Sequence, residues 1–597
     1  MQFSTLSTFF EKIEKVVSRL EITRILADLY NQLTADEIAQ TTYLLQGRVM
    51  PEYAGVEFGM GQKLVERGIA GALQIEVTSL RTEFKKQGDL GQVVEFYKKQ
   101  ILSFEEAALS ITTVFNELLR LAHANGPGSQ DTKVAIISHL IRQLDPLTCR
   151  YLVRMMLGQM RLGFSSMTVL DAYSWMLTGD KSMRAQIEEA YHVLPDLGRI
   201  GKILKEKGIV GLSDINPEIF IPIIMMRAER LSSGAEIIDK IGTCFIESKY
   251  DGFRLQIHYS GQTSEVRLYS RSLDDVSSMY PDVAQAVREN FGSHEVIFEG
   301  EAIGYDPITG GFLPFQETVQ RKRKYDIDAV AERIPLRLFV FDMLYLDGKN
   351  YIKQPFSVRR TALEKLFEKI SSTKTLQLAK QDRVESADVL DALFDSAITE
   401  GLEGIIAKKI DGLYRAGARD WNWIKFKRSY SSKIQDTIDV LVMGYDLGQG
   451  KRTGFGIGAF LVGVYDETLD QYVTVAKIGT GLTDNEWQEL KRKSEKFKVK
   501  NKPTNYLVDP AMECDVWVVP SIVVEIRADE ITRSQAHTAG RSMGLSKSGK
   551  SQVVMTAGFA LRFPRLERFR EDRTAEDVTT TGEIELMYNS QVSSQQK

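Results

Sequence analysis

The residues with the clearest chemical potential lie in the segment Glu247-Ser248-Lys249-Tyr250-Asp251-Gly252-Phe253-Arg254. Lys249 follows an apolar run at 244–246 that predicts a buried strand, and an Asp-Gly turn separates it from an alternating run at 255–258. A lysine at a strand end beside a guanidinium is suited to act as a nucleophile, because desolvation and a neighbouring cation both lower the pKa of its ammonium. The plainer alternative is a surface lysine in an Asp-Gly hairpin.

Further along the chain, short β-branched and aromatic runs carry the charged residues that phosphate chemistry needs. Lys425 and Lys427 alternate with apolar neighbours, so both ammoniums are expected on one face of a strand. Cations held away from bulk water stabilise the charge that develops on phosphate oxygens during attack at phosphorus. Glu301 and Glu403 are suited to bind a ribose or Mg²⁺, which prefers one or two carboxylates together with water and phosphate oxygens.

Together these residues form a series that resembles the motifs of the covalent nucleotidyltransferases, the superfamily of DNA ligases, RNA ligases and mRNA capping enzymes. Six elements in this order and spacing make a chance match untenable. They are Lys-x-Asp-Gly-x-Arg at 249–254, Ser270-Arg271, Phe298-Glu299-Gly300-Glu301, Phe341-Asp342-Met343-Leu344, Glu403-Gly404-Ile405-Ile406-Ala407-Lys408, and Trp423-Ile424-Lys425-Phe426-Lys427 with Arg419 ahead of it.

The resemblance implies a role for each residue type. Lys249 is expected to form a phosphoramidate with a nucleoside monophosphate, the ring of Phe341 to stack on the purine, and the arginines to bind phosphates through their planar forks. The expected nucleotide-binding residues are Glu247, Lys249, Arg254, Arg271, Glu301, Phe341, Arg419, Lys425 and Lys427, and the expected metal ligands are Glu301 and Glu403. A core position stays open for Phe341 and a surface ion pair for Glu247 and Lys408, and the role of Glu299 is open.

Composition and patterning predict three domains and a tail. Apolar residues at helical spacing predict an all-α N-terminal region over residues 1–215, and Gly-punctuated strands and helices predict an α+β domain over 216–430. Residues 431–585 show several short strands with glycine-rich turns, which is typical of a small β-barrel. The Ser/Gln-rich segment 586–597 is expected to be a disordered tail.

The flanking regions favour one branch of the superfamily. The helical region, with Arg150-Tyr151-Leu152-Val153-Arg154 and Arg161-Leu162-Gly163, is similar to the DNA-binding domain of archaeal-type ATP-dependent DNA ligases. On a helix, these arginines could either cap carbonyls or face a phosphate backbone. The C-terminal region resembles the OB-fold domain of the ligases, whose last motif commonly ends Arg-x-Asp-Lys. Here it ends Arg570-Glu571-Asp572-Arg573. Arginine keeps the positive charge of lysine but is longer and planar, so self-adenylylation is expected to be slower or differently tuned.

The implied function is sealing of nicks in duplex DNA, in replication, repair and recombination. The implied cofactors are ATP and Mg²⁺, with Mn²⁺ as a substitute, and the implied partners are nicked double-stranded DNA and a sliding clamp, for a monomeric enzyme. A hinge is expected at 429–436, so that the C-terminal region reaches the nucleotide and then the DNA. Without a signal peptide or an apolar run of roughly 18 residues, a cytoplasmic, nucleoid-associated protein is expected.

Several alternatives stay open from the sequence. An RNA ligase or capping-type enzyme shares the central motifs, and a catalytically silent DNA-binding scaffold could keep the fold. The nucleotide could be ADP, GTP or NAD rather than ATP. The net charge of −4 argues weakly against nucleic acid, although averaging over domains conceals basic clusters such as 321–324, which either contacts DNA or is simply solvated.

Overall fold

The computed structural model describes residues 1–101, 106–313, 315–323, 326–368, 374–427, 437–448, 456–480, 482–545 and 552–593. The chain divides into two compact units. One comprises Met1–Glu229, Ile238–Glu385 and Ala407–Ile424, and the other comprises Arg230–Ile237, Ser386–Ile406 and Lys425–Lys597. The hinge expected at 429–436 lies outside the described residues.

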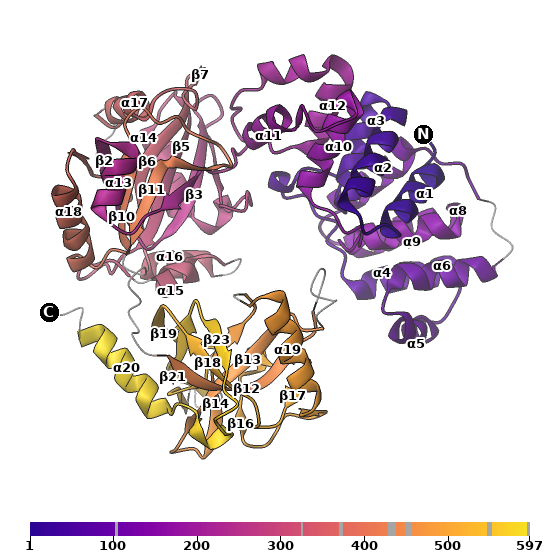
Figure 1. The fold of residues 1–597 in the computed structure, drawn as a ribbon. Helices are drawn as coiled ribbons and strands as arrows, with labels where there is room; N and C mark the ends of the chain where they lie inside the picture. The colour runs from indigo at the N-terminus through magenta and orange to yellow at the C-terminus, as the bar shows by residue number, and fades with distance from the viewer. Residues whose placement is uncertain are drawn as a thin grey trace. The chain divides into compact units, whose positions relative to one another are not determined.

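The N-terminal region is helical, as the apolar spacing predicts (Figure 1). Side-chain caps start several of its helices. Ser18 and Asp145 each accept a hydrogen bond from a first-turn amide, and Thr34 forms a reciprocal capping box with Glu37. The helices are α1 (Phe3–Glu14), α2 (Arg19–Gln32), α3 (Ala35–Leu45), α4 (Gln62–Leu73), α5 (Val77–Gln87), α6 (Leu90–Gln100), α7 (Ile111–His123), α8 (Ser129–Gln143), α9 (Pro146–Met156), α10 (Ser166–Thr178), α11 (Arg184–Val193) and α12 (Leu197–Lys207).

Two arginines of α9 lie inside this helical region rather than on a DNA-facing surface. Arg154 is 2% exposed and donates hydrogen bonds of 2.6 and 3.0 Å to Asp89 and of 2.9 and 3.0 Å to Glu14. Arg150 pairs with Glu95 and lies 3.6 Å from Glu14. These ion pairs join α1, α6 and α9, so both arginines are engaged inside the region. Of the arginines considered, Arg161 caps a carbonyl, donating a 3.1 Å hydrogen bond to Gly88 at the end of α5.

Two sheets form the central α+β region. The first has the order β4-β3-β5-β6-β7, with β8 parallel to β6, and packs its apolar face against helices α14 (Pro281–Asn290) and α17 (Phe356–Glu368). Its strands are β3 (Phe253–Ser260), β4 (Glu265–Tyr269), β5 (Glu295–Gly304), β6 (Leu336–Leu346), β7 (Lys349–Asn350) and β8 (Leu376–Leu378).

The second central sheet carries the lysine that the sequence singles out. Its order is β1-β11-β10-β2-β9, so β2 lies between β10 and β9. The strands are β1 (Arg227–Arg230), β2 (Cys244–Lys249), β9 (Gln381–Val384), β10 (Gly404–Lys409) and β11 (Arg419–Lys427). Helix α13 (Gly234–Ile241) follows β1 in the sequence, and helix α18 (Ala387–Thr399) follows β9.

The C-terminal region is rich in strands, as predicted. A curved sheet has the order β15-β17-β12-β13-β14-β16, with β18 paired to both β12 and β23. Its strands are β12 (Ile438–Asp446), β13 (Ala459–Asp466), β14 (Gln471–Ile478), β15 (Lys498–Val499), β16 (Tyr506–Leu507), β17 (Val516–Val518), β18 (Val523–Arg527) and β23 (Arg565–Phe569). Helix α19 (Asp484–Glu495) buries Trp487 and Leu490 in the core of this sheet.

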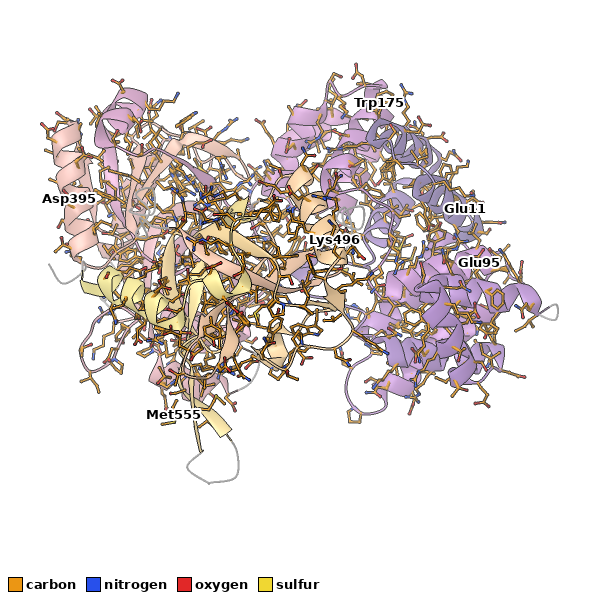
Figure 2. The ribbon with its side chains drawn as sticks, turned by 60° about the horizontal axis from the view of Figure 1, so that its bottom comes forward. Glu11, Glu95, Trp175, Asp395, Lys496 and Met555 are labelled. Carbon is orange, nitrogen blue, oxygen red and sulfur yellow. The ribbon has the colours of Figure 1, made fainter. Side chains whose placement is uncertain are left out.

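Two hairpin-like pairs complete the C-terminal region. Strands β19 (Glu530–Ser534) and β22 (Gly558–Arg562) pair with each other, as do β20 (Ser542–Leu545) and β21 (Gln552–Thr556). Figure 2 shows the second pair projecting from the region, with Met555 on it. The Met555 side chain is exposed.

The expected disordered tail is wrong for residues 586–593, which continue helix α20 (Thr581–Ser593). A reciprocal cap between Thr580 and Glu583 starts this helix. Ile584 is fully buried in the core of the C-terminal region, and the Gln591 amide exchanges two 2.9 Å hydrogen bonds with the backbone of Ile531. These few anchoring contacts order a segment whose composition alone suggested disorder. Among the described residues, none of the helices has the length and apolarity needed to cross a bilayer.

Candidate active site

Lys249 is the last residue of β2 and is half-buried. The turn that follows needs a glycine at position 252, because a Cβ there would lie 2.2 Å from the carbonyl oxygen of Ala302 on β5. The close approach of the turn to β5 sets the course of the chain into β3. Glu247 lies two residues before Lys249, so both side chains leave the same face of β2.

Glu247 is buried and forms an ion pair with a buried lysine, so the surface-pair alternative is wrong. Lys408 Nζ lies 2.6 Å from Glu247 Oε2, and the two side chains are 1% and 4% exposed. Gln381 donates a 3.1 Å hydrogen bond to Glu247 Oε1, and Arg360 Nη1 lies 3.9 Å from the same oxygen. Burial raises the pKa of Glu247 and lowers that of Lys408, while the attraction between the two charges opposes both shifts.

Arg254 is held by an internal network on β3. Its Nη2 donates to Glu299 Oε2 at 2.5 Å and to the Tyr414 hydroxyl at 3.3 Å, and its Nη1 donates to the carbonyl of Met226 at 2.7 Å. Glu299 is fully buried and also accepts hydrogen bonds from Gln256 and Tyr414. Burial opposes the charge of Arg254, but the nearby carboxylate of Glu299 outweighs it and raises the pKa of the guanidinium. The role left open for Glu299 is therefore to pair with Arg254.

One N–H group of Arg254 takes no part in this network. Its Nε is buried and has no hydrogen-bond partner among the described residues. Glu301 lies directly opposite Arg254 across β3 and β5 and is half-buried. Arg254, Gln256, Glu299 and Glu301 thus share one face of this strand pair.

Phe341 occupies a β-bulge. The pairing of β5 with β6 passes from Glu299↔Asp342 to Gly300↔Val340, which leaves Phe341 as the extra residue. Its ring is half-buried rather than part of the closed core, and Trp423 meets it edge-on at 5.9 Å. The cationic groups of Arg254 and Lys408 lie 5.3 and 4.7 Å from the ring centroid.

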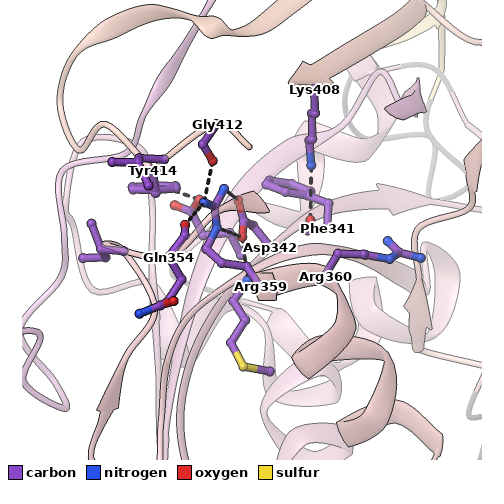
Figure 3. Close-up of polar contacts among 12 residues, drawn as sticks. Phe341, Asp342, Gln354, Arg359, Arg360, Lys408, Gly412 and Tyr414 are labelled. Carbon is purple, nitrogen blue, oxygen red and sulfur yellow. Dashed lines mark hydrogen bonds and ion pairs between the residues drawn. The ribbon is translucent and has the colours of Figure 1, made fainter. Parts of the chain in front are cut away.

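The residue after the bulge anchors it to the surrounding elements (Figure 3). Asp342 accepts two hydrogen bonds from Arg359 of α17, at 2.7 and 2.9 Å, and both side chains are 0% exposed. Arg359 also donates to the carbonyls of Gln354 and Gly412 at 2.8 and 3.0 Å. The bidentate pair therefore ties β6, α17 and the β10–β11 connection together.

The remaining predicted residues of the central region occupy the second sheet and a turn. Lys425 and Lys427 are half-buried on β11, whereas Ile424 and Phe426 are buried, so the two ammoniums share a strand face as expected. Lys427 pairs with Glu403, which directly precedes β10. Arg271, in the turn after β4, and Arg419, at the start of β11, are exposed.

The described part of the chain has no metal site built from side chains alone, because no group of three or more His, Cys, Asp and Glu residues there could hold an ion. In the basic run at 321–324, Arg321 is 1% exposed by its side chain and pairs with Asp282 at 2.5 Å, so it is a core residue. Lys322 and Arg323 are exposed, and Lys324 lies outside the described residues.

The C-terminal motif residues differ in how firmly they are held. Arg570 follows β23 and donates to both carboxylate oxygens of Asp439 at 3.0 Å and to Asp572 at 2.8 and 2.9 Å. Arg573 is 44% exposed, and its nearest carboxylate partner, Asp577, lies 3.9 Å away. Asp572 and Asp439 raise the pKa of Arg570, and the Arg570 guanidinium lowers the pKa of Asp572.

Three models of known protein families match this chain, one in each of its main regions. The model described as DNA ligase N terminus matches residues 2–174, that of the ATP dependent DNA ligase domain matches residues 225–427, and that of the ATP dependent DNA ligase C terminal region matches residues 453–573. A probable DNA ligase of Dictyoglomus turgidum is 45% identical over 593 residues, which cover 99% of this chain and 98% of the relative. The chain belongs to the ATP-dependent DNA ligase family.

A further relative agrees with membership of this ligase family, and a solved structure shares the fold. DNA ligase 2 of Thermofilum pendens is 39% identical over 604 residues, covering 99% of this chain and 98% of the relative, which supports the predicted archaeal-type resemblance. The solved structure of Pmar-Lig_Pre has the same fold, with a TM-score of 0.52 at 17% identity over 95% of this chain and 99% of that one. The prediction of an ATP-dependent DNA ligase is confirmed.

Sequence reasoning missed several residues that build the site of this ligase. Asp342 was quoted as part of a motif without a role, and its partner Arg359 carries no local pattern. Arg360 and Tyr414 were not nominated, although both lie among the buried charges around Glu247 and Glu299. Their positions depend on pairing between distant elements, which spacing along the chain does not reveal.

Proposed function

We propose that this ligase seals nicks in duplex DNA through an adenylylated Lys249. The observation that carries the proposal is the placement of Lys249 at the end of β2, on the face that carries the buried Glu247, with the half-buried ring of Phe341 beside the Glu247–Lys408 pair. A strand end, a flat aromatic ring and a buried carboxylate are suited to a nucleophile, a base platform and a polar base contact.

The residues present fit an adenine nucleotide as substrate. Buried N–H groups without a hydrogen-bond partner among the described residues lie at Arg254 Nε and Arg360 Nη1. Buried donors normally have acceptors, so a bound ligand or ordered water is expected to supply them. Phe341 offers stacking area, and Glu301, opposite Arg254 on the same strand face, offers a carboxylate to a ribose.

In the first proposed step, Nζ of Lys249 attacks the α-phosphorus of ATP. A bond forms between Nζ and phosphorus, the bond to the β-phosphate oxygen breaks, and pyrophosphate leaves. Lys425, Lys427 and Arg271 would stabilise the developing phosphate charge, with Arg419 contributing a further guanidinium. In the C-terminal motif, Arg570, Asp572 and Arg573 are proposed to orient the leaving pyrophosphate.

Magnesium fits these residues as an ion that the protein and the bound phosphates would coordinate together. Glu301 and Glu403 would hold the ion together with phosphate oxygens and water, and Mn²⁺ could replace Mg²⁺. When bound, such an ion would neutralise charge on the phosphates. Glu403 already pairs with Lys427, so Lys427 would have to share this carboxylate with the ion.

The two later steps act on DNA. The AMP group passes to a 5′-phosphate oxygen at the nick, which frees Nζ of Lys249. The 3′-hydroxyl oxygen then attacks the activated phosphorus, loses its proton and expels AMP, so the backbone is closed. In these steps, the main task of the protein is to hold the adenylyl group, the 5′-phosphate and the 3′-hydroxyl in reactive positions.

The flanking regions are proposed to hold the DNA. The strand order of the C-terminal sheet supports the proposal that this region is an OB-fold. It would contact first the nucleotide and then the duplex. The helical region would bind through phosphates with little sequence preference, so affinity should fall steeply with salt. A monomer that also binds a sliding clamp is the proposed working form.

The test is sealing of a single nick in duplex DNA with ATP and Mg²⁺, compared with the same nick in RNA. The proposal expects DNA to be sealed much faster. Equal or faster sealing of the RNA nick would replace it with an RNA ligase, and label transfer to the protein without any sealing would replace it with a capping-type enzyme.

A further inference from the structure

Three side chains on one face of β3 bind the backbone of the segment 219–226, called the strap, which leads into β1. The strand residues are two positions apart, as residues on one face of a strand must be. The strap residues are three positions apart and run in the opposite order. The contacts pair Arg254 with Met226, Gln256 with Ile223, and His258 with Phe220.

Gln256 is fully buried and uses its whole amide group in this arrangement. Its Oε1 accepts a 2.7 Å hydrogen bond from the N–H of Ile223 and one of 3.0 Å from Nε2 of His258. Its Nε2 donates to the carbonyl of Ile223 at 3.0 Å and to Glu299 Oε1 at 3.1 Å. Because Glu299 also accepts from Arg254, one buried amide connects the strap to the partner of an arginine of the nucleotide site.

Phe220 gives the strap a strained backbone conformation. Its φ of 69° lies in the left-handed region, which residues with large side chains rarely adopt. Its N–H donates to Nδ1 of His258 at 3.0 Å, and its carbonyl accepts from the Tyr269 hydroxyl at 2.6 Å. Burial lowers the pKa of His258 to about 3, so Nδ1 stays an acceptor at neutral pH. Strain of this kind persists only where surrounding contacts hold it, and it is common at functional sites.

We propose that the strap is a positioning element for adenylylation: bound to Gln256 and His258, it holds Arg254 in the orientation that binds ATP, and bound nucleotide in turn stabilises the strap on β3. The inference rests on the proposed function, because it assigns further positioning residues to the same reaction.

The contacts of Arg254 explain how the strap would act on the nucleotide. Nη1 donates to the carbonyl of Met226, and Nη2 donates to Glu299, which leaves the buried Nε for a ligand. The guanidinium carbon lies 5.3 Å from the centre of the Phe341 ring. Because a guanidinium is planar, holding two of its nitrogens sets the direction of the third. Loss of the strap contact would therefore free the plane to rotate and turn Nε away.

Such coupling is reciprocal. If the bound strap stabilises the nucleotide complex by some factor, the nucleotide stabilises the bound strap by the same factor. The amides of Phe220, Ile223 and Met226 each donate to a side chain of the central region, so their exchange with solvent reports release of the strap. A strap that only covers the sheet would exchange at the same rate with and without nucleotide.

The experiment measures hydrogen exchange of residues 219–226 in the full chain before and after adenylylation of Lys249. Adenylylation should slow exchange at Phe220 and Ile223 about tenfold in the wild type, and less than about twofold in Gln256→Met, which keeps the side-chain length without the amide. In the same variant the ATP concentration for half-maximal labelling should rise about tenfold, whereas the limiting rate should change less than about twofold, because weaker ground-state binding leaves the chemical step alone.

The matched control is Ser260→Ala. Ser260 lies on the same face of β3, two positions after His258, is 4% exposed and donates to Glu295 at 3.4 Å. Its loss should change neither the exchange of the strap nor the response to ATP. A second pair of variants tests the acceptor: His258→Asn, whose amide oxygen can take the place of Nδ1, should keep part of the slowing, and His258→Phe should lose it.

Equal exchange of the strap with and without adenylylation in the wild type would overturn the proposal. An unchanged half-maximal ATP concentration in Gln256→Met would overturn it as well. If Gln256→Met does not fold, as judged by its melting curve, the wild-type exchange and the two His258 variants decide, and equal slowing in both variants would contradict the proposal. If the wild type takes label from no nucleotide, the proposed ligase chemistry fails and this inference falls with it, whereas label without any effect on the strap removes this inference alone.

Discussion

Both carboxylate oxygens of Asp439 lie 3.0 Å from Nη1 of Arg570, at the start of the C-terminal sheet. Asp572 occupies the other edge of the same guanidinium, so both carboxylates compete with a pyrophosphate for Arg570. We therefore expect Asp439→Asn to raise the rate of Lys249 adenylylation several-fold, because it weakens the competing partner. The rate of nick sealing by enzyme that is already adenylylated should be unchanged.

Glu567→Gln is the control for this prediction. Glu567 pairs with Arg527 at 3.2 Å on an exposed part of the same region. Its loss should alter neither rate. Slower adenylylation in Asp439→Asn would instead mean that Asp439 supports Arg570 in its working position.

Arg573 stands where the family motif commonly has a lysine. It is 44% exposed and only loosely placed near Asp577, so a change of shape at this position should not disturb the fold. Arg573→Lys is expected to change adenylylation several-fold and to leave sealing by pre-adenylylated enzyme nearly constant, since a point charge replaces a planar fork. Arg527→Lys, at a similarly exposed arginine, should change neither, and equal effects of Arg573→Lys on both reactions would contradict its assignment to the leaving group.

Removing one partner of the buried Asp342–Arg359 pair should strongly destabilise the central region. Asp342→Ala leaves a 0% exposed guanidinium without its carboxylate, which costs about 3–5 kcal/mol. We expect a clear fall in the denaturant midpoint of that region. Removing Glu385, the exposed partner of Arg383, should cost about 1 kcal/mol or less. Similar midpoints for the two variants would show that the buried pair is energetically unimportant.

Arg154 should control the acid sensitivity of the helical region. Burial alone would raise the pKa values of Glu14 and Asp89, but hydrogen bonds from Arg154 hold both below their usual range. Carboxyls with lowered pKa values stabilise the fold above their unfolded values, roughly pH 4, and lose that contribution as the pH falls through the folded values. Thermal melts should therefore show stability falling below about pH 4, with a smaller dependence in Arg154→Met.

The same variant tests whether Arg154 binds DNA. Because its side chain is 2% exposed, Arg154→Met should lower stability at pH 7 without reducing the slope of log affinity against log salt. Arg120→Met, an exposed arginine of α7 paired with Glu117, is the stability control. A salt slope reduced by about one in Arg154→Met would show that this arginine contacts a phosphate after all.

The sequence predicted those features that depend on local order along the chain. The position of Lys249 at a strand end and the shared face of Lys425 and Lys427 follow from apolar runs and alternation, because strand periodicity is local. The helical and strand-rich character of the flanking regions was also accessible from residue patterns. The family itself followed from six short motifs in order.

Features that depend on distant partners were not accessible. Nothing near Arg254 in the chain reveals that Glu299 and Tyr414 will occupy its guanidinium, and nothing near Arg154 reveals Asp89 and Glu14. The buried state of Glu247 likewise depends on β10 supplying Lys408. The helix at 581–593 was missed because a few anchoring contacts outweigh a polar composition.

The central claim is that Lys249 carries the nucleotide, and the most direct test is labelling of the full chain with α-labelled ATP and Mg²⁺ on a denaturing gel. We predict an acid-labile label on the protein that is absent in Lys249→Ala and is discharged by nicked duplex DNA as the nick is sealed. Label and sealing that persist in Lys249→Ala would contradict the account.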